Sequence, residues 1–133
     1  MDEDKYHYAD RILLIEQELN KLTEDFDIRK AAMEDIFVRN ATTYKELSAL
    51  QFFLQYYFFY KRIDCHAPFA VATWRTKGLG IPTKNGKKIL FDKLNILLGK
   101  PTIIVNGKKQ KLTDNMTDAI GIGLFYCKNI LKL

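Results

Sequence analysis

The stretch that decides the fold is residues 112–124, which read Leu112-Thr113-Asp114-Asn115-Met116-Thr117-Asp118-Ala119-Ile120-Gly121-Ile122-Gly123-Leu124. Apolar residues after Asp114 recur at helical spacing and predict a helix that runs to about Leu131. Asp114 and Asp118 are four residues apart, so a helix brings both carboxylates to one face with Asn115 beside them. This helix is therefore the first candidate for a site built from carboxylate oxygens.

Two acids in the first turns of a helix also have a purely structural explanation. Asp114 is a good N-cap, and an acid near a helix N-terminus gains about 0.3–1 kcal/mol from the helix dipole. That explanation does not account for Gly121 and Gly123, because each glycine inside a helix costs about 1 kcal/mol relative to alanine. We expect another element, most simply a central sheet, to approach this helix closely.

Upstream of this helix, short apolar runs alternate with segments of helical periodicity. The runs within residues 11–16 and 68–74 are typical of buried strands, and Asn106-Gly107 predicts a tight turn between a strand at 102–105 and a second one at 110–112. Helices are predicted over residues 23–39, 43–62 and 87–98. Buried strands that alternate with long helices indicate an α/β fold with partly parallel pairing, and so few strands indicate an incomplete sheet.

Glu16 stands at the carboxyl end of the first apolar run, with Gln17 next to it. Open α/β sheets place ligands and catalytic groups at the carboxyl ends of their strands. An acid in this position can also simply mark the point where a strand leaves the core for solvent. Glu16 is therefore a candidate site residue, and its role depends on which groups lie near it.

Composition and charge narrow the class of protein. The 133 residues are 47% hydrophobic and 28% charged, which suits one globular domain over residues 1–133. Residues 1–50 hold 12 acids and 7 bases, whereas residues 51–133 hold 4 acids and 14 bases. Such an asymmetry is typical of a face that binds a polyanion, and it also occurs on basic surfaces that are merely solvated.

Several other classes find no support in the sequence. The aromatic run at residues 52–60 is too short to span a bilayer, and no apolar signal segment is present. Cys65 and Cys127 lack the spacing of a metal knuckle or of a disulfide framework. We therefore expect a cytoplasmic protein without a membrane span.

Three segments resemble RuvC-type Holliday-junction resolvases, in the family's order. Residues 13–17, Leu-Leu-Ile-Glu-Gln, resemble the family's "IEQ" strand. Thr73-Trp74-Arg75 with Gly78-Leu79-Gly80 resembles a "TWR…LG" segment of phage-encoded relatives. Residues 112–124 are similar to the C-terminal "DDxxDAxxIG" helix. Poxvirus resolvases share this order of elements, and the three matches span nearly the whole chain.

The resemblance implies an RNase H-like fold and a structure-selective DNA endonuclease that resolves branched DNA during recombination and repair, in a bacterial or phage-infected cell. Its acids would be Glu16, Asp114 and Asp118, holding Mg²⁺ or Mn²⁺ through hard carboxylate oxygens. Asn115 stands where the family often has an acid, which makes Asp118 the stronger candidate and leaves Asp114 as a ligand, a cap or a supporting group.

The chain also departs from the family at its N-terminus. Family members begin with a strand that carries an aspartate in a "DxG" or "DxS" context, and no residue upstream of Glu16 fits that role. We therefore expect an N-terminally incomplete resolvase domain. Its alternative function is that of a catalytically impaired fragment that retains dimerisation and DNA binding, and a third possibility is an unrelated structural protein that uses an aromatic helix to oligomerise.

The basic residues and the aromatic helix suggest the partners. The bases that cluster around the glycine-rich turn and the next helix, candidates for contacts with DNA phosphates, are Arg75, Lys77, Lys84, Lys87 and Lys88. Trp74 closes an apolar run, so we expect it in the core rather than stacked on a base. The helix at 43–62 has more aromatic side chains than one sheet face needs; core packing is the default explanation, and the resemblance implies that the surplus forms a homodimer seam.

Overall fold

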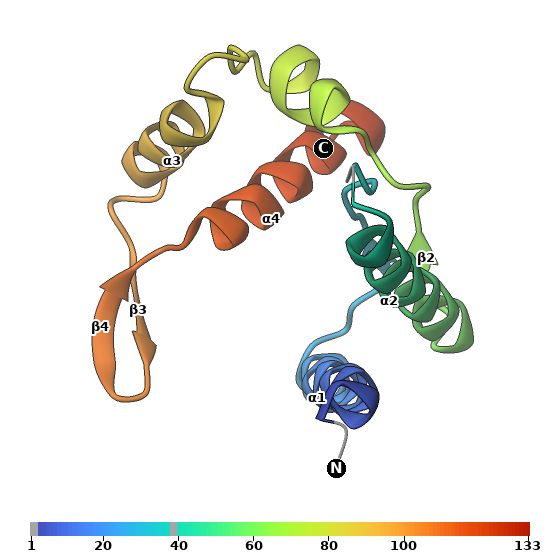
Figure 1. Cartoon of the computed structure of the whole chain (residues 1–133). Helices are drawn as coiled ribbons and strands as arrows, with labels where there is room; N and C mark the ends of the chain where they lie inside the picture. Colours follow the sequence, from blue (N-terminus) through green and yellow to red (C-terminus); the bar gives the residue numbers. More distant parts are fainter. Residues whose placement is uncertain (1–2, 38–39) are drawn as a thin grey trace. The chain divides into compact units, whose positions relative to one another are not determined.

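The computed structural model describes residues 3–37 and 40–133, with side chains from Tyr8 onward in these ranges (Figure 1). The elements, in chain order, are α1 (Glu3–Asp25), β1 (Lys30–Ala31), α2 (Ala41–Tyr60), β2 (Asp64–Cys65), the π-helix η1 (Ala72–Gly78), α3 (Gly86–Leu97), β3 (Thr102–Val105), β4 (Lys108–Lys111), α4 (Asp114–Phe125) and the π-helix η2 (Tyr126–Ile130). The expected mixture of helices and strands is confirmed, as two small two-stranded sheets. None of the described helices is long and apolar enough to cross a membrane.

The chain divides into two compact units. Unit 1 comprises Met1–Ala31 and Ile36–His66, and unit 2 comprises Ala32–Asp35 and Ala67–Leu133. The short segment of unit 2 that precedes α2 contains Glu34. Each unit has its own packing and is described separately.

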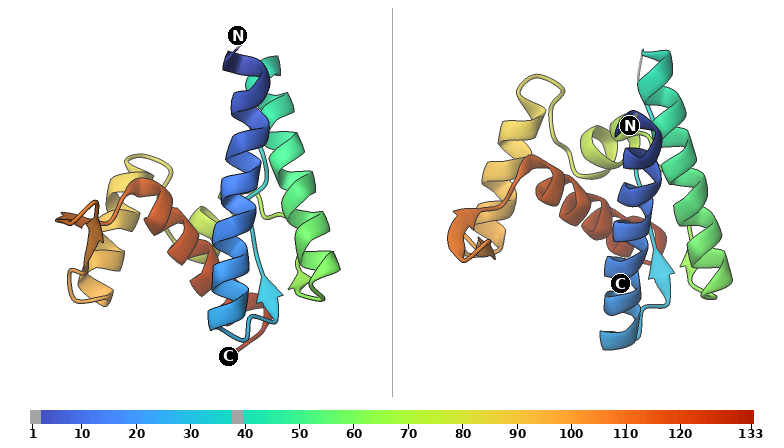
Figure 2. Two further views of the ribbon diagram at one scale, coloured as in Figure 1. Left: turned by 90° about the horizontal axis from the view of Figure 1, so that it is seen from below. Right: turned by 60° about the horizontal axis from the view of Figure 1, so that its bottom comes forward.

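Unit 1 is built on the helices α1 and α2, which lie side by side (Figure 2). The hydroxyl of Tyr57 is the main polar contact between them, because it donates to Oδ1 of Asn20 at 2.7 Å and lies 3.3 Å from the hydroxyl of Thr23. The strand predicted over residues 11–16 is wrong, since these residues lie inside α1. Ile12, Ile15 and later half-buried positions recur at helical spacing, and that longer pattern outweighs the short apolar run.

The helix predicted over residues 23–39 is also wrong, within the described residues. Helix α1 ends at Asp25, and β1 pairs in parallel with β2, with Lys30 opposite Asp64 and Ala31 opposite Cys65. The last two positions of the predicted helix, Val38 and Arg39, lie outside the described residues. The extended form of this segment depends on backbone partners more than 30 residues away, and local periodicity does not reveal such partners.

Unit 2 has a core of aromatic and aliphatic side chains contributed by the loops on either side of η1 and by η1, α3, α4 and η2. Its buried members are Phe69, Trp74, Ile81, Leu90, Leu94, Ile122, Phe125 and Tyr126. Trp74 is fully buried, which confirms its predicted place in the core. The strand predicted over residues 68–74 is wrong beyond Phe69, because the chain turns into η1 at Ala72. A short apolar run suits a buried helical turn as well as a strand.

Helix α4 begins at Asp114, as predicted, and Thr113 rather than Asp114 is its N-cap, with a side-chain oxygen that accepts from the backbone N–H of Met116 at 3.3 Å. The expected close approach to this helix is real, but its source is Trp74 rather than a central sheet. A Cβ atom at Gly121 would lie 2.8 Å from Cζ3 of Trp74, whereas one at Gly123 would have no contact within 4 Å. Gly121 therefore makes room for the buried indole.

Helix α3 matches the predicted helix at 87–98 to within one residue at each end. The predicted hairpin is confirmed, with Val105 opposite Lys108, although β4 begins two residues before the predicted strand at 110–112 and ends at Lys111. Asn106 and Gly107 both have positive φ angles, 52° and 76°, as a type I′ turn requires. The hairpin connects the C-terminal end of α3 to the N-terminal end of α4 (Figure 1).

Candidate active site

Unit 2 brings two carboxylates from distant parts of the sequence together, those of Glu34 and Asp118. The backbone around Glu34 is fixed by the buried residue Phe69, whose N–H donates to the carbonyl of Met33 at 2.9 Å and whose carbonyl accepts from the N–H of Asp35 at 2.8 Å. This parallel bridge holds Glu34 in an extended conformation. Asp118 lies in the second turn of α4, and its charge acts directly on Glu34.

The pKa of Glu34 reflects its burial and the charge of Asp118. Burial raises the pKa of Glu34 above its usual range, and the negative charge of Asp118 raises it further. The positive charges of Arg75 and Lys87 lower the same pKa in part. A half-buried pair of carboxylates with an incompletely compensated charge is a place where an added cation is stabilised.

Arg75 is the main counterion of this pair. Its Nη2 atom lies 3.1 Å from Oδ1 of Asp118, and the two side chains are only 13% and 20% exposed. The guanidinium also lies over the indole of Trp74, with Cζ 5.0 Å from the ring centroid. The Arg75 stem also lies near the start of α3, where a Cβ on Gly86 would be 3.6 Å from Cδ of Arg75, at ordinary van der Waals distance. Contacts from η1 and α4 thus hold this arginine beside Asp118.

Two buried donors beside the carboxylates have no hydrogen bond of standard geometry within the described part of the chain. They are Nε1 of Trp74 and Nε of Arg75. The Trp74 side chain does interact with the Glu34 carboxyl closely enough to lower the pKa of that group. The site therefore combines carboxylate oxygens that attract a cation with N–H groups that can donate to an anionic oxygen.

The predicted acids occupy different environments. Asp118 belongs to the cluster, Asp114 is an exposed residue in the first turn of α4, and Asn115 beside it is also exposed. Glu16 belongs to unit 1, where it lies on α1 and lines a cavity of about 390 Å³ together with Asn20, Phe53, Tyr56, Tyr57, Tyr60 and Lys61. Of the predicted acids, the structure thus places Asp118 beside Glu34.

The predicted basic residues divide into two kinds. Arg75 is half-buried and paired with Asp118, which removes it from the set of freely available phosphate ligands. Lys77, Lys84, Lys87 and Lys88 are exposed, and none of them has an ion pair with another side chain that the structure describes. The charge of Lys87 also reaches Glu34, so the N-terminal end of α3 adjoins the acidic pair.

Glu34 is the site residue that the sequence reasoning missed. Met33-Glu34-Asp35 has the same order of an apolar residue, a glutamate and a polar residue as Ile15-Glu16-Gln17. The two segments share only this general pattern, and the predicted helix over residues 23–39 drew attention away from the second one. Among the described side chains, no group of three or more His, Cys, Asp or Glu residues is close enough to form a metal cluster, so the site offers two carboxylates.

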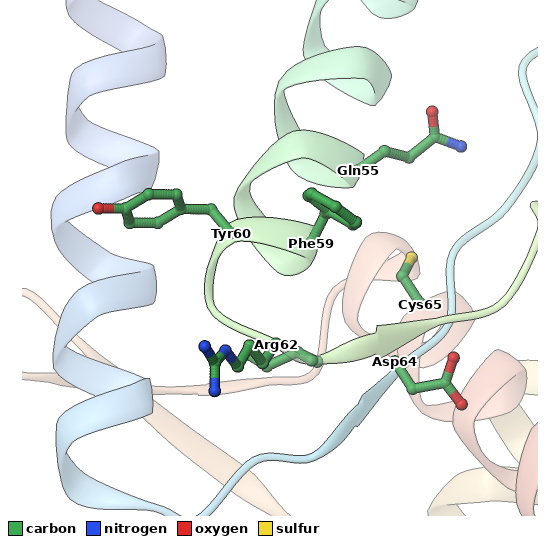
Figure 3. A pocket seen from close by; sticks show the side chains of 7 residues that line it. Gln55, Phe59, Tyr60, Arg62, Asp64 and Cys65 are labelled. Carbon is green, nitrogen blue, oxygen red and sulfur yellow. The ribbon is translucent and has the colours of Figure 1, made fainter.

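Unit 1 has a separate cavity of about 760 Å³ where α2 ends (Figure 3). It is lined by Gln55, Phe59, Tyr60, Arg62, Ile63, Asp64 and Cys65. Burial raises the pKa of the Cys65 thiol, and the charge of Asp64 raises it further. A thiol with a raised pKa is a poor nucleophile at neutral pH, so this cavity lacks an activated cysteine.

Comparison of the chain with protein-family models, with curated proteins and with solved structures finds no significant match.

Proposed function

We propose that this chain is part of a Mg²⁺-dependent DNA endonuclease of the RuvC type, with an RNase H-like fold, that resolves branched DNA such as Holliday junctions. The observation that carries the proposal is the coupling of Glu34 to Asp118 in unit 2. Asp118 lies on the helix that most resembles the family's acid-bearing helix, and Glu34 lies in a parallel β-bridge that precedes an aromatic helix. In this proposal Glu34 takes the role that the sequence first suggested for Glu16.

The residues of the cluster suit a divalent cation. Mg²⁺ in phosphoryl-transfer sites is held by one or two carboxylates together with water and substrate phosphate, and Glu34 and Asp118 supply two such groups. Burial, followed by the charge of Asp118, raises the pKa of Glu34, and a bound cation would stabilise its charged form. Bound Mg²⁺, or Mn²⁺, would supply activation of the attacking water and stabilisation of charge at the leaving oxygen.

The neighbouring side chains position these carboxylates and the DNA. Arg75 holds Asp118 and is itself held over Trp74, so the orientation of the α4 carboxylate depends on the packing of η1. The exposed lysines around the turn and α3, namely Lys77, Lys84, Lys87 and Lys88, contact backbone phosphates. Asp114, exposed one turn before Asp118, is a weaker candidate for a further metal ligand.

Helix α2 supports the proposal that two copies of the chain act together. Phe52, Phe59 and Tyr60 are 70%, 82% and 71% exposed, which leaves a large aromatic surface without cover inside unit 1. Such a surface is typical of an interaction face. A homodimer formed through α2 would present two sites to the symmetric arms of a four-way junction.

A second candidate function is that of a DNA-binding fragment without catalysis. The observation that favours it is that, among the described side chains, the acidic cluster stops at two carboxylates. Losing one metal ligand weakens metal binding and hydrolysis together. The two candidates share the DNA-binding face and differ in the presence of cleavage.

Cleavage of a labelled synthetic four-way junction in Mg²⁺ tests the proposal. We expect Glu34→Gln and Asp118→Asn each to reduce cleavage to background, whereas Glu16→Gln, the same chemical change in unit 1, leaves it near the wild-type rate. Cleavage that survives in both Glu34→Gln and Asp118→Asn contradicts the proposed site. Junction-selective binding by a wild-type chain that does not cut supports the second candidate.

A further inference from the structure

The β3–β4 hairpin is a strongly basic segment that the proposed site does not use. Residues 99–113 contain Lys100, Lys108, Lys109 and Lys111 and no acid. All four lysines are exposed, and none has an ion pair with another described side chain. This stretch carries four of the 14 basic residues in the second part of the chain, so it contributes strongly to the charge asymmetry.

The geometry of the hairpin presents these charges on both faces of a narrow ribbon. Ile104 pairs with Lys109 and Val105 with Lys108, so neighbouring lysines of β4 point to opposite faces. The ribbon reaches about 13 Å from its base, given four residues per strand and about 3.3 Å per residue. Its type I′ turn at Asn106-Gly107 fixes this register.

The hairpin adds little to the core of unit 2. Ile103 is its one half-buried strand residue, whereas Ile104 is 71% exposed and Val105 39% exposed. A two-stranded hairpin that is open on both faces is marginally stable by itself. Its sequence is therefore better explained by a partner than by folding, and the concentration of lysine specifies a polyanion as that partner.

The position of the hairpin relates it to the acidic pair. The chain passes from β4 through Thr113 directly into α4, whose second turn carries Asp118. The hairpin thus stands next to the N-terminal end of α4. A two-stranded β-ribbon also fits the major groove of duplex DNA, where lysines on both of its faces can reach the phosphates of the two strands.

We infer that the β3–β4 hairpin is a DNA-binding ribbon that lies in a groove of the duplex arm beside the Glu34–Asp118 site. Lys108 and Lys109 at its distal end contact phosphates on the two sides of the groove. This inference rests on the proposed DNA-directed function. It assigns to the hairpin a sequence-independent contribution to affinity, separate from the lysines around α3.

The salt dependence of DNA binding tests the ribbon. Fluorescence anisotropy with a labelled four-way junction, in Ca²⁺ so that cleavage does not interfere, gives Kd at several salt concentrations. Each lost phosphate contact reduces the magnitude of the negative slope of log (1/Kd) against log salt by about 0.9. We expect Lys108→Gln/Lys109→Gln to reduce this magnitude by about 2 and Lys108→Arg/Lys109→Arg to keep it.

The matched control is Lys45→Gln/Lys132→Gln, which removes the same charge from exposed positions on α2 and at the C-terminal end of the chain. We expect this control to leave the slope within about 0.5 of the wild-type value. Equal slopes for the hairpin variant and the wild type overturn the ribbon and leave the endonuclease proposal standing. A wild-type chain that binds no DNA overturns both, and far-UV circular dichroism confirms that each variant is folded.

Discussion

The two units differ in how much of their aromatic side chains is exposed to solvent. Unit 2 encloses Trp74, Phe69 and Phe125, which are 0%, 6% and 5% exposed, around one small polar cluster. Unit 1 buries Tyr57 but leaves most of the other large rings of α2 in solvent. A unit with a closed core can hold carboxylates at fixed positions, whereas a unit with open aromatic faces is suited to bind another surface. The difference agrees with the functions that we propose, chemistry for unit 2 and association for unit 1.

The largest expected difference between the units is in the loss of stability when an aromatic ring is removed. Trp74→Ala is expected to lower the free energy of unfolding by about 3–5 kcal/mol, because it empties the centre of the unit 2 core and removes the support of Arg75. Phe59→Ala, at a position 82% exposed, is expected to change the free energy of unfolding by about 0.5 kcal/mol or less. Urea denaturation measures both. Similar losses for the two variants would remove the contrast between the units.

The next largest effect tests whether α4 packs against Trp74. Gly121→Ala places a methyl group 2.8 Å from the Trp74 ring and is expected to destabilise the protein by about 1–3 kcal/mol. Gly123→Ala, two residues further on, meets no atom within 4 Å and is expected to stabilise the helix by up to about 1 kcal/mol. Thermal unfolding of the two variants checks this opposition of sign. If both substitutions stabilise the protein, α4 does not pack on Trp74 as described.

A smaller effect is expected at the polar contact of unit 1. Tyr57→Phe removes the hydroxyl that donates to Asn20 and is expected to cost about 0.5–1.5 kcal/mol of stability. Tyr56→Phe is the matched control, since the ring of Tyr56 is 59% exposed and Tyr57 is buried. Urea denaturation of the pair measures the difference. An equal response of the two variants would show that α1 and α2 are not joined through this hydroxyl.

Sequence reasoning succeeded where local signals and tertiary packing agree. The turn at Asn106-Gly107 demands positive φ angles that these two residues adopt readily. The sequences of α3 and α4 have helical periodicity and sufficient length, and α4 also has the N-cap Thr113. The burial of Trp74 followed from its place at the end of an apolar run. Gly121 indicated a close approach, although the neighbour turned out to be an indole rather than a sheet.

Sequence reasoning failed where contacts with residues far along the chain decide the local structure. The apolar run at residues 11–16 is helical because half-buried positions continue at helical spacing to Thr23, and the run at 68–74 turns into η1 so that Trp74 is buried and Arg75 meets Asp118. Glu34 was missed because its extended conformation depends on Phe69, 35 residues later. A glutamate between apolar residues is a weak signal by itself, and its meaning comes from Asp118.

The pKa of Glu34, measured by nuclear magnetic resonance on the selectively labelled side chain, tests the coupling of the two carboxylates most directly. Because the charge of Asp118 raises this pKa, Asp118→Asn is expected to lower it, and freeing Arg75 from its partner acts in the same direction. Asp114→Asn, on the exposed first turn of the same helix, is expected to leave the pKa of Glu34 nearly unchanged. If the pKa of Glu34 is the same in the wild type and in Asp118→Asn, the two acids do not form one site.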